Sequence, residues 1–261
     1  MLLKDLKTAL PVFRLPHFSP YKVYIQSDHK RVVFLNPKVG STAFREIVVA
    51  AMKQQGIPPA RGRGWPMNSK RRYMTAPLRD YIDAFAHPQR YEFHCFVRNP
   101  YTRVISAWND KLVKGFYAPQ YPPSMRKLVP QIRRYARDNN LLGASEEAPV
   151  PFATFLSYIE SQPEGKRNQH WDTQTSVLCL EKVCYTHIHQ IETGMVQGVM
   201  HLLQPLGVSP DWIRQQLSRP ANASGPLAAP VLNSELADRI YNLYQKDFEH
   251  FGYSRQSWEN L

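Results

Sequence analysis

Residues 31–54 of this 261-residue chain, RVVFLNPKVGSTAFREIVVAAMKQ, decide the fold. The run Arg31–Leu35 is short, β-branched and aromatic, so it predicts a buried strand, which Asn36 and Pro37 bring to an end. A tight turn follows, and Ala43–Gln54 then predicts a helix. The apolar residues of that helix recur at helical spacing: Phe44, Ile47, Val48 and Ala51. This stretch therefore predicts a strand, a turn and a helix in direct succession.

The same succession occurs again further along the chain. Tyr91–Val97 predicts a core strand, Arg98–Pro100 a turn, and Tyr101 to about Lys114 a helix. Two such units predict parallel strands with helical crossovers and ligands bound beyond the carboxyl ends of the strands. The predicted fold class is α/β, a P-loop-like parallel β-sheet flanked by helices, with additional helices in the C-terminal half. Both turns are expected to face one crevice.

The other segments are assigned from periodicity and turn residues. Residues 57–80, rich in Pro, Gly and Arg, predict a long surface loop. Further helices are predicted over residues 124–138, 151–161, 193–206 and 234–251, and a further strand over residues 182–188. Because 43% of the residues are hydrophobic, the chain can bury a core, and we predict one domain over residues 1–261.

The chain is strongly basic, with 33 Lys and Arg against 21 Asp and Glu and a formal net charge of +12. A positive field favours an anionic partner, such as a nucleic acid, an acidic membrane, an acidic polysaccharide or a nucleotide. No nucleic-acid motif is recognisable, and the aromatic residues do not interleave with the basic stretches, so nucleic acid is not the expected partner. No stretch approaches the roughly 20 apolar residues of a membrane span.

The first turn, PKVGST at residues 37–42, has the composition of a phosphate-binding loop. A turn between a strand and a helix presents free backbone N–H groups and the positive end of the helix dipole. Gly40 allows close backbone approach, and Lys38 adds a full charge. Ser41 and Thr42 add hydroxyl donors. Since the lysine precedes the glycine, the pattern is not the magnesium-dependent GxxxxGK[ST] loop. We therefore predict a metal-free anion cradle, with an ordinary capped helix as the alternative.

The second turn lies within FVRNPYTRVISAW at residues 96–108. Arg98 stands at the end of the strand, and arginine is suited to bidentate phosphate binding. Ser106 follows eight residues later, about two helical turns away. By itself Ser106 reads as a helix serine that faces a neighbour, but together with Arg98 and the first turn it indicates a second anion site.

These residues resemble the sulfotransferases that use 3′-phosphoadenosine 5′-phosphosulfate (PAPS), and among them the chondroitin and dermatan 4-O-type carbohydrate sulfotransferases. PKVGSTAFR at residues 37–45 is similar to that family's 5′-phosphosulfate loop, and residues 96–108 are similar to its 3′-phosphate motif. NQHWDTQTSVLC at residues 168–179 resembles its N-x-H-W segment, and IYNLYQKDFEHFGYS at residues 240–254 resembles its closing helix. The segments between these motifs match poorly.

The resemblance implies a PAPS-dependent sulfotransferase that releases adenosine 3′,5′-bisphosphate. Its 5′-phosphosulfate would be held by the first turn, namely Pro37, Lys38, Val39, Gly40, Ser41 and Thr42. Arg98 and Ser106 would hold the 3′-phosphate, and Lys38 would stabilise charge on the leaving oxygen. The domain then divides into an N-terminal extension (residues 1–30), a PAPS-binding part (residues 31–114), and an acceptor-side and C-terminal helical part (residues 115–261).

The attacking hydroxyl needs a general base, and a histidine suits that role near neutral pH. His170, in the N-x-H-W segment, is the first candidate, and Trp171 beside it is expected to pack against a sugar ring; a structural role for His170 is the alternative. Three others stay open. His94 lies in the strand before Arg98, His87 precedes a proline, and Glu46 lies in the first turn of the predicted helix, where a salt-bridged acid is the favoured interpretation.

The three cysteines, Cys95, Cys179 and Cys184, are too few for a disulfide scaffold. Cys95 is expected to be buried, whereas Cys179 and Cys184 either form a disulfide or remain buried thiols. A zinc site with His187 and His189 is not expected, because Cys184 and His187 would face opposite sides of a strand over residues 182–188. No metal is assigned.

The resemblance makes a glycan the expected acceptor. The basic stretches at residues 61–72 and 126–137 would line the groove of a glycan that carries acids; the alternative is that Arg133, Arg134 and Arg137 form a solvated helix face. Acceptors of the same reaction include small alcohols, phenols and protein tyrosines. The alternative from another class is a polyanion-binding module without catalysis. The chain as given is expected to be soluble, in the cytoplasm if bacterial or in the Golgi lumen if it is a trimmed eukaryotic protein.

Overall fold

The computed structural model describes residues 2–59, 70–114, 128–141, 148–218 and 232–261. The chain divides into two compact units. The first comprises Met1–Arg98 and Gln174–Asn222, and the second comprises Asn99–Thr173 and Ala223–Leu261. Each unit is described by itself below.

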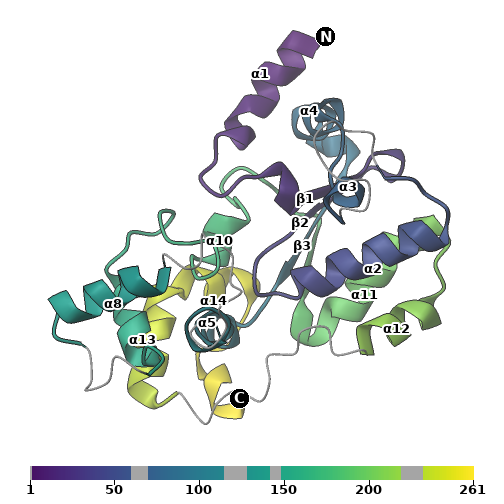
Figure 1. Ribbon diagram of the computed structural model, residues 1–261. Helices are drawn as coiled ribbons and strands as arrows, with labels where there is room; N and C mark the ends of the chain where they lie inside the picture. Colours follow the sequence, from purple (N-terminus) through teal and green to yellow (C-terminus); the bar gives the residue numbers. More distant parts are fainter. Residues whose placement is uncertain (1, 60–69, 115–127, 142–147, 219–231) are drawn as a thin grey trace. The chain divides into compact units, whose positions relative to one another are not determined.

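The first unit contains a four-stranded sheet with the order β1-β2-β3-β4 (Figure 1). Its strands are β1 (Val23–Gln26), β2 (Arg31–Phe34), β3 (Glu92–Val97) and β4 (His187–Gln190). The pairs β2–β3 and β3–β4 are parallel, and β1 is antiparallel to β2. Parallel pairing places the carboxyl ends of β2 and β3 at the same edge of the sheet, so the segments that follow them begin side by side.

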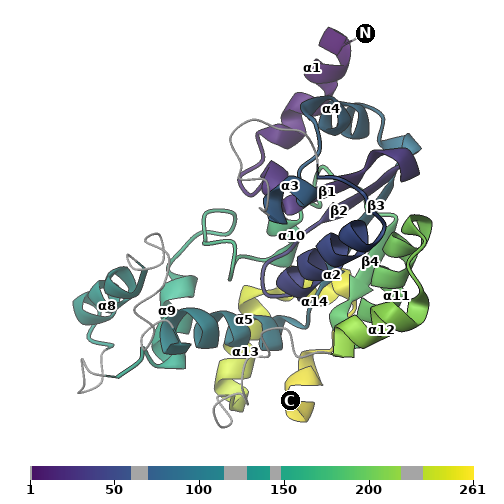
Figure 2. The ribbon, with the colours of Figure 1, turned by 45° about the vertical axis from the view of Figure 1, so that its right-hand side comes forward.

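Helices cover both faces of this sheet. The helices of this unit are α1 (Leu2–Phe13), α2 (Ser41–Gln54), α3 (Lys70–Met74), α4 (Leu78–Ala86), α10 (Gln174–Val177), α11 (Ile191–Leu203) and α12 (Pro210–Ser218), and α1 packs on α4. Figure 2 shows α2, α11 and α12 together on one side, where Val33 and Phe96 pack against them. The alternate strand residues Phe34 and Phe93 face the other side and pack against Phe85 of α4. The central strands β2 and β3 are therefore buried on both faces, which explains their nearly continuous apolar runs, whereas β4 is partly exposed.

The second unit is helical. It contains α5 (Pro100–Trp108), which continues into a π-helical turn at Asn109–Val113, and α8 (Leu128–Asp138), α9 (Phe152–Glu160), α13 (Ser234–Leu243) and α14 (Gln245–Phe251). Asn99 caps α5, since its side chain accepts a hydrogen bond from the backbone of Tyr101. Trp171 lies in the core of this unit and is 1% exposed. Short 3₁₀ turns complete the two units at Pro20–Lys22, Ser27–His29, Pro88–Arg90, Gln204–Leu206 and Arg255–Asn260.

The predicted fold class is confirmed, but several boundaries are wrong. The predicted loop at residues 57–80 contains α3 and the start of α4, apart from residues 60–69, which lie outside the described part. The strand predicted over residues 182–188 instead runs from His187 to Gln190. The helix predicted over residues 234–251 is interrupted at Tyr244, and the strand β1 was not predicted. Among the described helices, none combines the length and the apolar character that a membrane span requires.

Candidate functional site

The turn between β2 and α2 contains two residues in the left-handed backbone region. Lys38 and Gly40 both adopt positive φ angles, 69° and 75°. A lysine in this conformation is strained by about 1–2 kcal/mol relative to the right-handed region. At Gly40 any Cβ would also approach Met195 Cε to 3.3 Å, so this position favours glycine. The helix begins at Ser41, and Gly40 and Thr42 are exposed, so the N–H groups at the start of α2 are open to a ligand.

Arg98 ties the second turn to the first within the same unit. Its Nη1 donates to the carbonyl oxygen of Lys38 over 3.2 Å. This contact follows from the parallel pairing of β2 with β3, because both strands end at the same edge of the sheet. The structure therefore brings together Lys38 and Arg98, which the sequence placed 60 residues apart.

Gln174 holds the two strand ends together. Its Oε1 accepts hydrogen bonds from Asn36 Nδ2 at 2.9 Å and from the Arg98 backbone N–H at 3.0 Å. Its Nε2 donates to the Arg98 carbonyl oxygen at 2.7 Å. Gln174 and Asn36 are both fully buried. Sequence reasoning missed this residue, although it lies inside the quoted segment at residues 168–179.

Replacing Gln174 by leucine is expected to lower the free energy of unfolding by about 1–3 kcal/mol, because Asn36 and Arg98 lose the buried hydrogen bonds that Gln174 makes with them. Gln174→Glu keeps an accepting oxygen but loses the donor to the Arg98 carbonyl, so we expect a smaller loss. Urea denaturation measures both. Gln215→Leu, at an exposed position of α12, is the matched control. An unchanged free energy of unfolding in Gln174→Leu would remove this structural role.

In the second unit, Asn168 orients His170. The Asn168 side-chain oxygen lies 2.7 Å from His170 Nδ1 and also accepts the His170 backbone N–H at 3.1 Å. An Nδ1–H that donates to Asn168 leaves Nε2 as the basic nitrogen. His170 is half-buried. The N-x-H spacing therefore fixes one tautomer of a histidine that keeps access to solvent.

Trp171 does not have the role that the sequence suggested. It is 1% exposed, its Nε1 donates to Gln162 Oε1, and its ring meets Phe155 edge to face at 5.3 Å. The expectation that Trp171 packs against a sugar ring is wrong, since a ring buried in the core cannot meet a ligand.

Arg103 holds the segment around His170 from within the same unit. Its guanidinium donates to the carbonyl oxygens of Asp172 at 2.6 Å and Gln169 at 3.0 Å. Arg103 is 2% exposed, and burial lowers the pKa of its guanidinium, which the carboxylate of Asp247 opposes. Ser106, on the same helix, is also buried, at 2% exposure.

Each of the other three base candidates lies beside a charged or polar side chain. Glu46 forms an ion pair with Lys70 at 2.8 Å, as expected for a first-turn acid. His87 Nε2 lies 3.5 Å from Asp5 Oδ1. His94 is fully buried on the α11 side of the sheet, where its Nδ1 lies 3.2 Å from His189 Nε2. His94 lies within β3, and His87 follows the last residue of α4.

All three cysteines are free thiols. Cys95 and Cys179 are buried, and burial raises the pKa of both, that of Cys179 to about 11. Cys184 is exposed and precedes β4, so it is neither bridged to Cys179 nor a buried thiol.

The parallel strands that each lead through a turn into a helix, with the backbone N–H groups of Ser41 and its neighbours open, define the P-loop-like α/β class. The sequence profile described as "Sulfotransferase family" matches residues 22–254. The chain therefore belongs to the sulfotransferase family.

Sequence similarity to carbohydrate sulfotransferases supports this family assignment. The chain is 23% identical over 245 residues to carbohydrate sulfotransferase 11 of Danio rerio, covering 91% of this chain and 68% of that protein. It is 31% identical over 188 residues to carbohydrate sulfotransferase 12 of Mus musculus, covering 66% of this chain and 42% of that protein. It is 23% identical over 254 residues to carbohydrate sulfotransferase 10 of Homo sapiens, covering 90% and 67%. No solved structure matches the chain.

Proposed function

We propose that this enzyme transfers the sulfuryl group of PAPS to a hydroxyl of an acidic carbohydrate. The observation that carries the proposal is the link between the two turns, in which Arg98 donates to the Lys38 carbonyl and Gln174 joins both strand ends. A donor with phosphate at both its 5′ and 3′ positions needs two such sites at a fixed spacing. The printed names of the relatives support the carbohydrate acceptor.

The first turn, residues 37–42, would hold the 5′-phosphosulfate with its backbone N–H groups and the hydroxyls of Ser41 and Thr42. Arg98 would hold the 3′-phosphate, whereas Ser106, which the sequence also suggested for this role, is only 2% exposed. In this arrangement Lys38 stabilises negative charge on the oxygen that leaves the sulfur, and no metal is required for that step.

The reaction is a direct displacement at sulfur. The acceptor oxygen forms a bond to sulfur while the bond from sulfur to the phosphate oxygen of PAPS breaks, which releases adenosine 3′,5′-bisphosphate. The proton of the acceptor hydroxyl passes to His170 Nε2, whose tautomer Asn168 fixes. By analogy with phosphoryl transfer, catalysis comes from positioning and charge stabilisation.

A small cavity beside α2 supports an acidic acceptor. It has a volume of about 180 Å³ and is lined by Tyr21, Arg45, Lys70, Met74 and Thr75. Arg45 lies in the first turns of α2, four residues after Ser41, and so close to the donor turn. Arg45 favours a carboxylate or sulfate group, while Lys70 is paired with Glu46, and Tyr21, 44% exposed, offers an aromatic face for a sugar.

The decisive test is transfer of labelled sulfate from PAPS to a panel of glycans, small alcohols, phenols and tyrosine peptides. Labelling of an acidic glycan is expected, and labelling of only a phenol or peptide would replace the acceptor. Calorimetry is expected to show adenosine 3′,5′-bisphosphate binding without magnesium, whereas a preference for ATP with magnesium would reject the donor. Salt-sensitive polyanion binding with no transfer to any acceptor would favour a non-catalytic module.

His170→Ala is expected to lower kcat by about 100-fold, the lower end of the range for a general base, with bisphosphate binding retained. The acidic limb of the pH profile identifies the role, because loss of the base removes the fall in kcat that protonation of that base causes at low pH. His250→Ala, at an exposed position of α14 in the same unit, is the control. Full turnover in His170→Ala would assign the proton to another group.

A further inference from the structure

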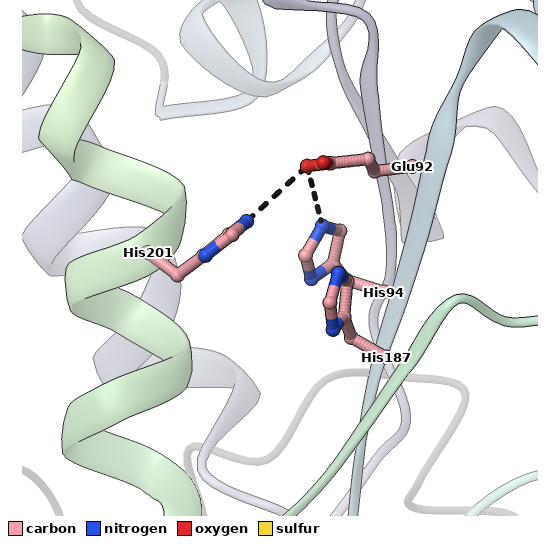
Figure 3. A group of neighbouring side chains, drawn as sticks. All are labelled: Glu92, His94, His187 and His201. Carbon is pink, nitrogen blue, oxygen red and sulfur yellow. Dashed lines mark hydrogen bonds and ion pairs between the residues drawn. The ribbon is translucent and has the colours of Figure 1, made fainter.

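Three histidines and a glutamate meet on one side of the sheet (Figure 3). Glu92 and His94 are two residues apart on β3, so both side chains point to the same face. His187 stands directly opposite His94 on β4. His201 comes from α11, which covers that face. The four residues lie within the first unit, and their ligand atoms are all within 4.8 Å of one another.

Gly198 explains why α11 reaches the sheet so closely. A Cβ at this position would approach His189 Cγ and Phe96 Cε1 to 2.8 Å each. Only glycine fits without displacing these rings. Because His201 follows three residues later on the same helical face, this close packing directs it toward Glu92 and His94.

Two separations in this group are close to those of a four-coordinate metal site. Bonds of about 2.1 Å to zinc in a tetrahedron place neighbouring ligand atoms about 3.4 Å apart. Glu92 Oε2 lies 3.2 Å from His201 Nε2 and 3.6 Å from His94 Nε2. Imidazole nitrogens with one carboxylate oxygen are a common donor set for zinc.

His94 is oriented as a metal ligand would be. It is fully buried, and its Nε2 has no hydrogen-bond partner among the described residues. Its other nitrogen, Nδ1, lies 3.2 Å from His189 Nε2. Ligating histidines use their second nitrogen in this way to fix the ring and its tautomer. An Nδ1–H that donates to His189 leaves the Nε2 lone pair of His94 aimed at the group.

We propose that Glu92, His94, His187 and His201 form a binding site for a zinc-like divalent cation, with His189 orienting His94. The site is separate from the donor turns, since Glu92 and Arg98 are six residues apart along an extended strand, about 20 Å. The ion therefore stabilises the sheet and α11 and takes no part in sulfate transfer.

Two neighbours adjust when the ion binds. The rings of His94 and His187 are stacked 4.6 Å apart, so the partly exposed His187 turns its ring to direct a nitrogen at the ion. Arg31 Nε donates to Glu92 Oε2 over 2.9 Å and lies beside the ion. Glu92 has two carboxylate oxygens, so one of them binds the ion and the other accepts the hydrogen bond from Arg31.

The test is calorimetric titration of the full, EDTA-treated chain with zinc chloride, together with absorption spectra after addition of Co²⁺. We expect saturable binding of one ion per chain, the visible bands of four-coordinate Co²⁺, and a higher Tm with the metal. His189→Ala is expected to weaken binding by about 10–100-fold, as for other residues that orient ligands. The double variant His187→Ala/His201→Ala, which changes only partly exposed side chains, is expected to lose the site.

Two control variants test whether zinc binding is specific to the proposed ligands. His250→Ala and Cys184→Ser should bind zinc as the parent does, because neither belongs to the group. Bisphosphate binding by every variant checks that the first unit is folded. The absence of saturable binding, unchanged affinity in the double variant, or loss of binding in Cys184→Ser would overturn the proposal.

Discussion

Replacing Lys38 by alanine is expected to lower kcat for sulfate transfer by about 10³-fold, with a much smaller effect on bisphosphate affinity. A cation that stabilises the transition state of phosphoryl transfer contributes about 10³–10⁵-fold, and Lys38 has the corresponding place at the sulfuryl group in the proposed reaction. The product lacks that group, so its binding depends more on Arg98 and on the backbone of the turn. A kcat effect without a matching binding effect is therefore the signature of this role.

Alanine is a clean substitution at this position. Lys38 has a φ of 69°, and alanine meets the same backbone restriction there as lysine, so the variant mainly removes the ammonium group. Lys182→Ala, an exposed lysine of the same unit, is the control and should keep full activity. Normal kcat in Lys38→Ala would assign charge stabilisation to another cation.

The sequence predicted the two strand–turn–helix units because their signals are local. Arg31–Leu35 and Tyr91–Val97 are short apolar runs, and each is followed at once by turn residues and a helical period. Such patterns need no knowledge of distant contacts. Hence the strands β2 and β3 and the start of α2 were found within a residue or two.

Elements whose character depends on the rest of the chain were missed. β1 is only four residues long and is stabilised by pairing with β2, so VYIQ alone carries little signal. α4 lies in a Pro- and Arg-rich region, and its apolar face is defined by contact with the sheet through Phe85. The closing helix is interrupted at Tyr244, whose hydroxyl donates to the Trp171 carbonyl.

The residues of the candidate site divide in the same way, into those with a local sequence signal and those that depend on distant contacts. The turn residues Lys38, Gly40 and Arg98 were found because a phosphate loop has a local composition. Gln174 was missed because its partner Asn36 is 138 residues away. The group around His94 was missed because only the parallel register of β3 and β4 brings His187 beside His94. The strand predicted over residues 182–188 also had the wrong bounds, so the sequence offered Cys184, and not His94, as a neighbour of His187.

Arg103→Leu is expected to lower the free energy of unfolding by about 3–5 kcal/mol, measured by urea denaturation. The arginine is 2% exposed, and its charge faces the fully buried Asp247. Removing it takes away a positive charge that compensates this carboxylate in the core. It also frees the carbonyls of Gln169 and Asp172, which frame His170, so kcat should fall as well.

The double variant Arg103→Leu/Asp247→Leu should recover part of this stability, since removing both buried charges costs less than removing one. Arg134→Leu, exposed on α8, is the control and should stay within about 0.5 kcal/mol of the parent. A small effect of Arg103→Leu, or no recovery in the double variant, would contradict the pairing. The arginine of the motif at residues 96–108 and the aspartate of the closing helix then have a joint role: they secure the segment that carries His170.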